Sequence, residues 1–187
     1  MPIASTNIPA LVGKASSVSG SFVTDANPEL STVTTLDANS GSNQTSLTVT
    51  TTAGFESAAD LLTLAGAGLS GSDATIQVTA LGVSGANSAT KLTIPGVAIR
   101  TSVVAGAAVT RWNRIGITAR PKHVRVTRRD NGDYYDWTDG MEPYSANTSI
   151  GGVTALQAKV MLCQPGAIHF APGMLAASQT YDIVIDY

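Results

Sequence analysis

The sequence is poor in cysteine, in aromatic residues and in charge. The single cysteine, Cys163, excludes an intrachain disulfide framework of the kind that holds small secreted domains together. Charged residues make up 13 % of the 187 residues and aromatic residues 5 %, against a usual charged share of about 25 %. A hydrophobic share of 43 % and a net charge of −2 do not fit a wholly disordered chain. Such small, weakly charged side chains favour thin β-layers over one large core.

Long apolar runs are also missing. No stretch approaches the roughly 18 uninterrupted apolar residues that a membrane-spanning helix needs. Residues 1–17 lack the charged start and apolar run of a secretory leader. We therefore expect a soluble protein, made in a reducing compartment, with no membrane contact and no cleaved leader.

The hydrophobic pattern that is present predicts an all-β fold with very little helix. Short runs of period two, separated by glycine, begin near Ser46 and recur every 10 to 15 residues. The pattern ends in a clear strand, where Tyr181, Ile183 and Ile185 alternate with more polar neighbours. We predict an extended N-terminal arm at 1–45, with a disordered tail as the alternative, followed by small β-barrel or β-sandwich modules at 46–110 and 111–187.

Charge is sorted along the chain. A basic band without any acid comprises Lys91, Arg100, Arg111, Arg114, Arg120, Lys122, Arg125, Arg128 and Arg129. An acidic band without any base follows it and comprises Asp130, Asp133, Asp136, Asp139 and Glu142. Complementary bands allow copies of a protein, or a protein and its partner, to dock in one register.

The dipeptide Asn131-Gly132 lies where the two bands meet. Asn-Gly between two strand-like runs is the strongest short-range hairpin signal, because both residues tolerate a positive φ. The hairpin places the two bands opposite each other, so we expect some charges to pair across strands, each pair contributing about 0.2–1 kcal/mol. Residues 143–152 are predicted as a polar loop, and 155–163 as the next strand.

Candidate reactive groups lack the companions that catalysis needs. Cys163 and His169 lie six residues apart across a Pro-Gly turn, but nothing marks an orienting group or an oxyanion hole. The acidic band fails as a calcium loop, since Gly132 and Glu142 fall at the wrong positions. The glycines between Gly66 and Gly71 lack the lysine and the helix of a phosphate-binding loop. We expect no enzyme activity, no cofactor and no metal.

Two binding classes other than protein docking are weighed. The basic band beside Trp112 resembles a nucleic-acid surface, but the net charge is negative and the acidic band would repel phosphate. A receptor- or glycan-binding platform would use four aromatic residues, Trp112, Tyr134, Tyr135 and Trp137. Aromatic residues in strands more often fill cores or pair across strands, so docking on protein is preferred.

Two parts of the chain resemble β-modules in structural proteins of tailed bacteriophages. The first consists of Leu47-Thr48-Val49-Thr50, Ala53-Gly54-Phe55, Leu62 to Gly68 and Ala74 to Ala80. The second consists of Pro121 to Val126, Asp136-Trp137-Thr138-Asp139-Gly140-Met141 and Thr180 to Ile185. Together the two parts cover about two-thirds of the sequence, all of it from about residue 46 onward.

The resemblance implies a non-enzymatic virion structural protein, most similar to a capsid decoration (cement) protein. Such proteins are β-rich homotrimers on the capsid exterior that bridge major capsid subunits and stabilise the shell, and they are made in the host cytoplasm. Tail or neck adaptors and fibre-base proteins share similar modules and are the alternative.

We assign docking to the second module and to the arm. The residues expected to contact the capsid or a neighbouring subunit are Arg111, Arg114, Arg120, Arg125, Arg128 and Arg129. The arm contacts are Ile3, Ile8 and Leu11, in a segment that would add backbone hydrogen bonds to a neighbour's sheet edge. Many weak contacts of this kind act together once neighbouring copies have docked.

Overall fold

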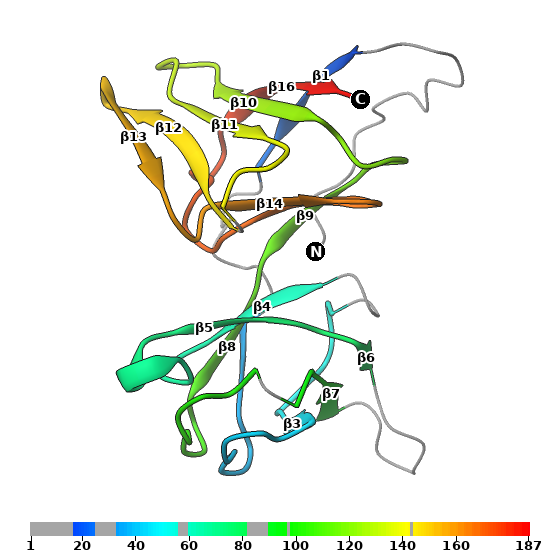
Figure 1. Cartoon of the computed structure of the whole chain (residues 1–187), viewed down its shortest axis with the longest axis vertical. Coiled ribbons are helices and arrows are strands. Elements are labelled where there is room, and N and C mark those ends of the chain that lie inside the picture. The colour runs from blue at the N-terminus through cyan, green and yellow to red at the C-terminus, as the bar shows by residue number, and fades with distance from the viewer. Residues whose placement is uncertain (1–16, 25–32, 56–59, 82–89, 97, 143) are drawn as a thin grey trace. The chain divides into compact units, whose positions relative to one another are not determined.

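The computed structural model describes residues 17–24, 33–55, 60–81, 90–96, 98–142 and 144–187 (Figure 1). Within these residues the chain is mostly β-strand and divides into two compact units, which confirms the predicted all-β class. The first unit takes its described residues from 33–112, and the second from 17–24 and 113–187. A short 3-10 turn occurs at Leu69–Gly71. Among the described residues, no helix has the length and apolar character needed to cross a membrane.

The first unit consists of two antiparallel sheets that share one core. The sheets have the strand orders β2-β8-β4-β5 and β3-β7-β6. The strands are β2 (Val33–Thr35), β3 (Ser46–Thr48), β4 (Leu61–Leu64), β5 (Ala74–Gln77), β6 (Ala80–Leu81), β7 (Lys91–Thr93) and β8 (Ala108–Arg111). Buried side chains from both sheets, among them Leu47, Leu64, Ile76, Leu92 and Val109, form one hydrophobic cluster.

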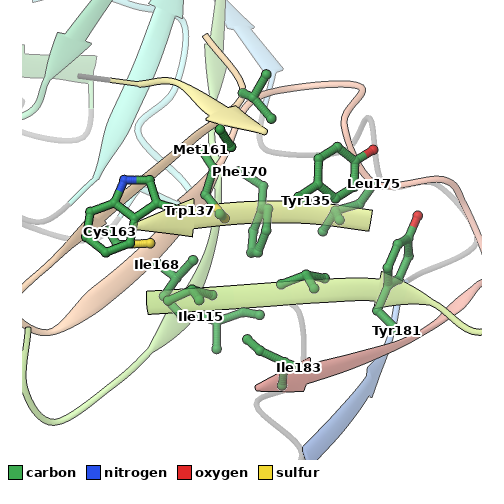
Figure 2. Close-up of a cluster of buried hydrophobic side chains, with 14 of the residues drawn as sticks. Ile115, Tyr135, Trp137, Met161, Cys163, Ile168, Phe170, Leu175, Tyr181 and Ile183 are labelled. Carbon is green, nitrogen blue, oxygen red and sulfur yellow. The ribbon is translucent and has the colours of Figure 1, made fainter. Parts of the chain in front are cut away.

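The second unit also consists of two antiparallel sheets around one core. The larger sheet has the order β1-β16-β10-β11-β12-β13, and the smaller has the order β14-β15-β9. The strands are β1 (Ser17–Val23), β9 (Asn113–Gly116), β10 (His123–Arg128), β11 (Tyr134–Thr138), β12 (Ala146–Ile150), β13 (Val153–Gln157), β14 (Met161–Gln164), β15 (Ala167–Phe170) and β16 (Thr180–Asp186). Figure 2 shows the core, in which Trp137 and Tyr181 from the larger sheet lie in one cluster with Phe170 from the smaller.

Strand alternation decides which side chains enter this core. Along β16, Tyr181, Ile183 and Ile185 are buried, whereas the residues between them face outward. The same period of two governs β10, where Val124 and Val126 are buried. The alternation predicted for the last strand is therefore confirmed.

Part of the segment predicted as an arm belongs to the two units. Strand β1 pairs with β16 from Ser17↔Asp186 to Val23↔Thr180. The ring of Phe22 stacks on that of Tyr181 with 5.5 Å between centroids. Sequence alternation does not reveal this strand, because the inward position between Val18 and Phe22 is Gly20, which has no side chain.

Two other local predictions were wrong. The segment predicted as a polar loop at 143–152 contains β12, which pairs with β13 through a turn at Gly151-Gly152. Both glycines have a positive φ, 58° and 81°, and a two-glycine connection is itself a hairpin signal. The single strand predicted at 155–163 is divided between β13 and β14, with residues 158–160 in neither strand.

The predicted hairpin at Asn131-Gly132 forms, but with a longer loop. Strand β10 pairs with β11 from His123↔Thr138 to Thr127↔Tyr134. The N–H of Gly132 donates to the carbonyl of Arg128 at 2.9 Å. Of the two loop residues only Gly132 has a positive φ, at 77°. The Asn131 side chain instead accepts a hydrogen bond from the N–H of Asp133 at 3.0 Å.

Candidate docking face

The outer face of the larger sheet in the second unit carries opposite charges side by side. Its strands turn their apolar residues to the core, so the alternate residues of β10, β11 and β16 point away from it. We use the name charged face for His123, Arg125, Tyr134, Asp136, Asp182 and Asp186. The register of the three strands brings these residues next to one another.

His123 joins three strands through its two ring nitrogens. Its Nδ1 lies 2.9 Å from Oδ2 of Asp186, the residue directly opposite on β16. Its Nε2 lies 2.8 Å from Oδ1 of Asp136 on β11. A protonated imidazole donates from both nitrogens, so the charged form of His123 can satisfy both carboxylates at once.

The two carboxylates hold His123 in its charged form. Partial burial opposes the imidazolium, but hydrogen bonds to Asp186 and Asp136, together with their negative charges, outweigh it, so the pKa of His123 is raised above 6.5. Hydrogen bonds from the Ser17 hydroxyl and from His123 lower the pKa of Asp186 below 3.8. Strand β1 therefore takes part in the same polar group through Ser17.

Arg125 is positioned by two neighbours on β11. Its Nη1 lies 3.5 Å from Oδ2 of Asp136. Its guanidinium carbon lies 4.0 Å from the centroid of the Tyr134 ring, a cation–π geometry. The prediction that charges of the two bands pair across the hairpin strands is confirmed at Arg125 and Asp136.

Three further arginines of this unit pair with carboxylates, and we refer to the two more exposed ones, Arg120 and Arg129, as the rim arginines. The third, Arg128, lies opposite the buried Tyr181 and therefore on the core-facing side of β10. Arg120 Nη2 lies 2.6 Å from Asp139 Oδ1, and Arg128 Nη2 lies 2.7 Å from Asp130 Oδ2. Arg129 holds Asp182 through two nitrogens, with its Nε 3.2 Å from Oδ2. This contact lowers the pKa of Asp182. Much of the basic band is thus neutralised by acids of its own chain.

The remaining residues assigned to docking lie elsewhere. Arg111 ends β8 in the first unit and is only 5 % exposed, so its guanidinium is not presented to a partner. Arg114 lies on β9 opposite His169 and is partly buried. The proposed arm contacts Ile3, Ile8 and Leu11 lie outside the described residues.

The candidate nucleophile pair is separated by the pleat of its sheet. Cys163 pairs with Ile168 and His169 pairs with Leu162, so the side chains of Cys163 and His169 point to opposite faces of β14 and β15. Burial raises the pKa of the Cys163 thiol, which disfavours the reactive thiolate. His169 Nε2 is 3.0 Å from Nε2 of Gln164. Both residues serve the packing of the smaller sheet.

The candidate aromatic platform and metal site are not assembled either. Trp112, Tyr135 and Trp137 are buried, and Tyr134 is covered by Arg125. In the described part of the chain, no three His, Cys, Asp or Glu side chains are grouped as metal ligands. Asp130, Asp136 and Asp139 of the acidic band face cations of the protein itself.

The charged face makes stability depend on the protonation of His123. A raised pKa in the folded state stabilises the fold fully below the unfolded pKa of about 6.5, and the contribution is lost as pH rises through the folded pKa. We expect the stability advantage of the natural chain over His123→Gln to shrink by about 0.5–1 kcal/mol between pH 5 and pH 8. Urea unfolding of both proteins across this pH range measures the difference in their free energies of unfolding. Both proteins keep His169, so its contribution is the same in both, and parallel pH profiles would contradict the assignment.

Sequence reasoning did not find the role of His123, Asp182 and Asp186 in this face. All three occupy outward positions of alternating strands, but no sequence signal places β16 beside β10. Comparison of the chain with protein family models, with curated proteins and with solved structures finds no match.

Proposed function

We propose that the chain is a non-enzymatic virion structural protein that decorates and stabilises the capsid of a tailed bacteriophage by bridging major capsid subunits. The observation that carries the proposal is the charged face with its rim arginines, an outward sheet surface on which opposite charges hold one another in place. Three parts of the proposal come from the resemblance to phage β-modules: the assignment to a phage particle, the place on the capsid exterior and the trimeric state. The chain is then made in the host cytoplasm and bound to the assembled shell.

The rim arginines are suited to recognise a second protein. A guanidinium has five N–H donors, and the contacts of Arg120 and Arg129 described above use one and two of them inside the chain. Exposed ion pairs contribute only about 0–1 kcal/mol, so a partner carboxylate can share such an arginine at little cost. Because the pairs already restrain the long side chains, docking loses less side-chain entropy than it would with free arginines.

Pair-swapped variants separate docking from folding. In Arg129→Asp with Asp182→Arg, and in Arg120→Asp with Asp139→Arg, each internal pair and the net charge are kept while the positions of the charges are exchanged. We expect the free energy of unfolding to change by less than about 0.5 kcal/mol each. Occupancy on phage capsids stripped of the chain should fall at least tenfold for the combined variant.

A matched control keeps the sign of each charge. The variant Arg120→Lys with Arg129→Lys should dock far better than the swapped variant, because its surface potential is unchanged. Equal occupancy of natural and swapped proteins on the shell would refute docking through the rim arginines.

Copy number in purified virions tests the virion role itself. A decoration protein is present in many copies spread over the shell, whereas a tail or neck adaptor or a fibre-base protein occurs in a few copies at one vertex. Quantitative mass spectrometry of virions from the source that encodes the chain distinguishes them. A chain missing from these virions would overturn the proposal.

A further inference from the structure

Strand β13 is an edge strand whose side chains are exposed on both faces of the sheet. It lies at the end of the larger sheet of the second unit and, among the described residues, pairs with β12 alone. Residues 153–156 are all exposed, and Val153 and Leu156 are 69 % and 60 % exposed. A strand with one face against the core would bury every second residue, so the apolar residues of β13 do not serve the core of its own chain.

Edge strands usually carry features that block further pairing, and β13 carries none. Natural proteins protect an edge with a lysine, a proline or a bulge. The strand Val153–Gln157 has no charge and no proline, and its pairing with β12 runs without a bulge from Ala146↔Gln157 to Ile150↔Val153. An unprotected and uncharged edge that exposes apolar side chains is a template for another strand.

The geometry of the hairpin fixes which residues face the open edge. In a two-residue hairpin the closing pair, here Ile150 and Val153, exchanges its hydrogen bonds between the strands. Hydrogen-bonded pairs then recur at every second position, so Ala155 also bonds toward β12. The backbone groups of Thr154 and Leu156 consequently point away from β12, to the open edge.

We propose that β13 pairs antiparallel with β13 of a second copy of this chain, about a twofold axis at Ala155. Thr154 and Leu156 of each copy then exchange backbone hydrogen bonds with Leu156 and Thr154 of the other. Two exposed leucines meet diagonally across the axis, within the reach of long side chains. The inference goes beyond the proposed function, because a twofold contact joins two copies and is not the interface of a trimer; between the proposed trimers it would link one copy of each.

The charges around β13 favour a second copy as the occupant. A twofold axis places like residues close together, which is unfavourable for a charged strand but costs nothing for an uncharged one. Beyond the end of β13 at Gln157, the same register leads the bend that contains Lys159 toward Gly151 of the other copy. The Asp133 carboxylate accepts a hydrogen bond from the N–H of Gly151 at 2.8 Å, so each lysine approaches a fixed negative charge. Both ends of the paired strands are thus complementary.

Cysteine cross-linking tests the register in the purified full-length chain. With Cys163→Ala as the background, Ala155→Cys places the two new cysteines opposite each other in a non-hydrogen-bonded pair. The expected Cα separation of about 4.5 Å lies within the range of a disulfide. The control Val153→Cys lies on the same exposed edge. In the proposed pairing, however, residue 153 of one copy is displaced by four residues along the strands from residue 153 of the other, so the two cysteines are about 13 Å apart. We expect mild oxidation to link Ala155→Cys at least tenfold faster than Val153→Cys.

A backbone variant tests the edge without adding a cysteine. Thr154→Pro removes an N–H that points to the open edge and leaves the bonds between β12 and β13 in place. Sedimentation equilibrium should show that the twofold association of the natural chain weakens at least tenfold in Thr154→Pro. The circular dichroism spectrum should stay unchanged.

The results of these two experiments either support or overturn the pairing of β13 between two copies. The pairing is overturned if Ala155→Cys cross-links no faster than Val153→Cys, or if Thr154→Pro does not affect the association. The β13 edge would then be available to pair with a strand of another protein. Register-specific cross-linking together with a chain missing from virions supports the pairing and refutes the virion role instead.

Discussion

Replacement of Phe22 by alanine is expected to lower the free energy of unfolding of the second unit by about 3–5 kcal/mol. Phe22 is 6 % exposed and comes from β1, at the edge of the larger sheet. Its ring stacks on Tyr181 and lies 6.4 Å from the ring of Phe170 in the smaller sheet. The substitution therefore leaves a cavity between the two sheets and removes two aromatic contacts.

Phe22 also holds the end of β1 next to a polar contact. The hydroxyl of Thr24 donates to the carbonyl of Ala176 at 2.6 Å and accepts from the N–H of Gln179 at 2.9 Å. The hydroxyl of Tyr181, against which Phe22 packs, accepts from the N–H of Ala176 at 2.8 Å. When the ring is removed, these buried hydrogen bonds lose part of their shielding from water, which places the expected loss toward the upper end of the range.

Tryptophan fluorescence measures the effect, because Trp137 lies in the core of the second unit and Trp112 belongs to the first. Urea unfolding in a Trp112→Phe background follows Trp137 alone. Val23→Ala is the matched control, since Val23 is the next residue on β1 and is 59 % exposed. We expect this control to change stability by less than about 0.5 kcal/mol. Equal effects of the two substitutions would mean that β1 is not part of this core.

The fold class was predictable from the sequence because its strongest signals are local. The alternation of apolar and polar residues in β10 and β16 directly indicates which side chains enter the core. Asn131-Gly132 indicates the hairpin between β10 and β11. Strand β12 was missed because three of its five residues, Asn147, Thr148 and Ser149, are polar. Thr148 is nevertheless buried, with its hydroxyl donating to the carbonyl of Ala155, so polarity alone hid the strand.

The candidate site was predictable only where the contacts are local. The pair Arg125–Asp136 follows from the hairpin. The contacts His123–Asp186 and Arg129–Asp182 require β16 to lie beside β10, and 63 and 53 residues separate these partners. In the same way, 152 residues separate Thr24 from Ala176. Strand order in an antiparallel sheet is set by which apolar faces share a core, and composition or periodicity does not encode it.

Replacement of Leu64 by alanine should have the corresponding effect on the first unit, lowering its free energy of unfolding by about 2–5 kcal/mol. Leu64 is fully buried on β4, which lies between β8 and β5. Its neighbours across the sheet, Ala74 and Val109, are also in the cluster. Ala74 is small and Val109 is stiff at its β-branch, so neither can fill the space left by the leucine.

A matched leucine in the same unit shows whether burial causes this loss. Leu69 begins the 3-10 turn Leu69–Gly71 and is 74 % exposed, so Leu69→Ala removes the same atoms at a cost below about 0.5 kcal/mol. Trp112 reports the transition in a Trp137→Phe background, because its Nε1–H donates to the hydroxyl of Thr63 on β4 at 2.9 Å. We expect Leu64→Ala, but not Leu69→Ala, to shift this transition to lower urea. A large loss in Leu69→Ala would mean that an unseen surface covers the turn, and no loss in Leu64→Ala would contradict the core of the first unit.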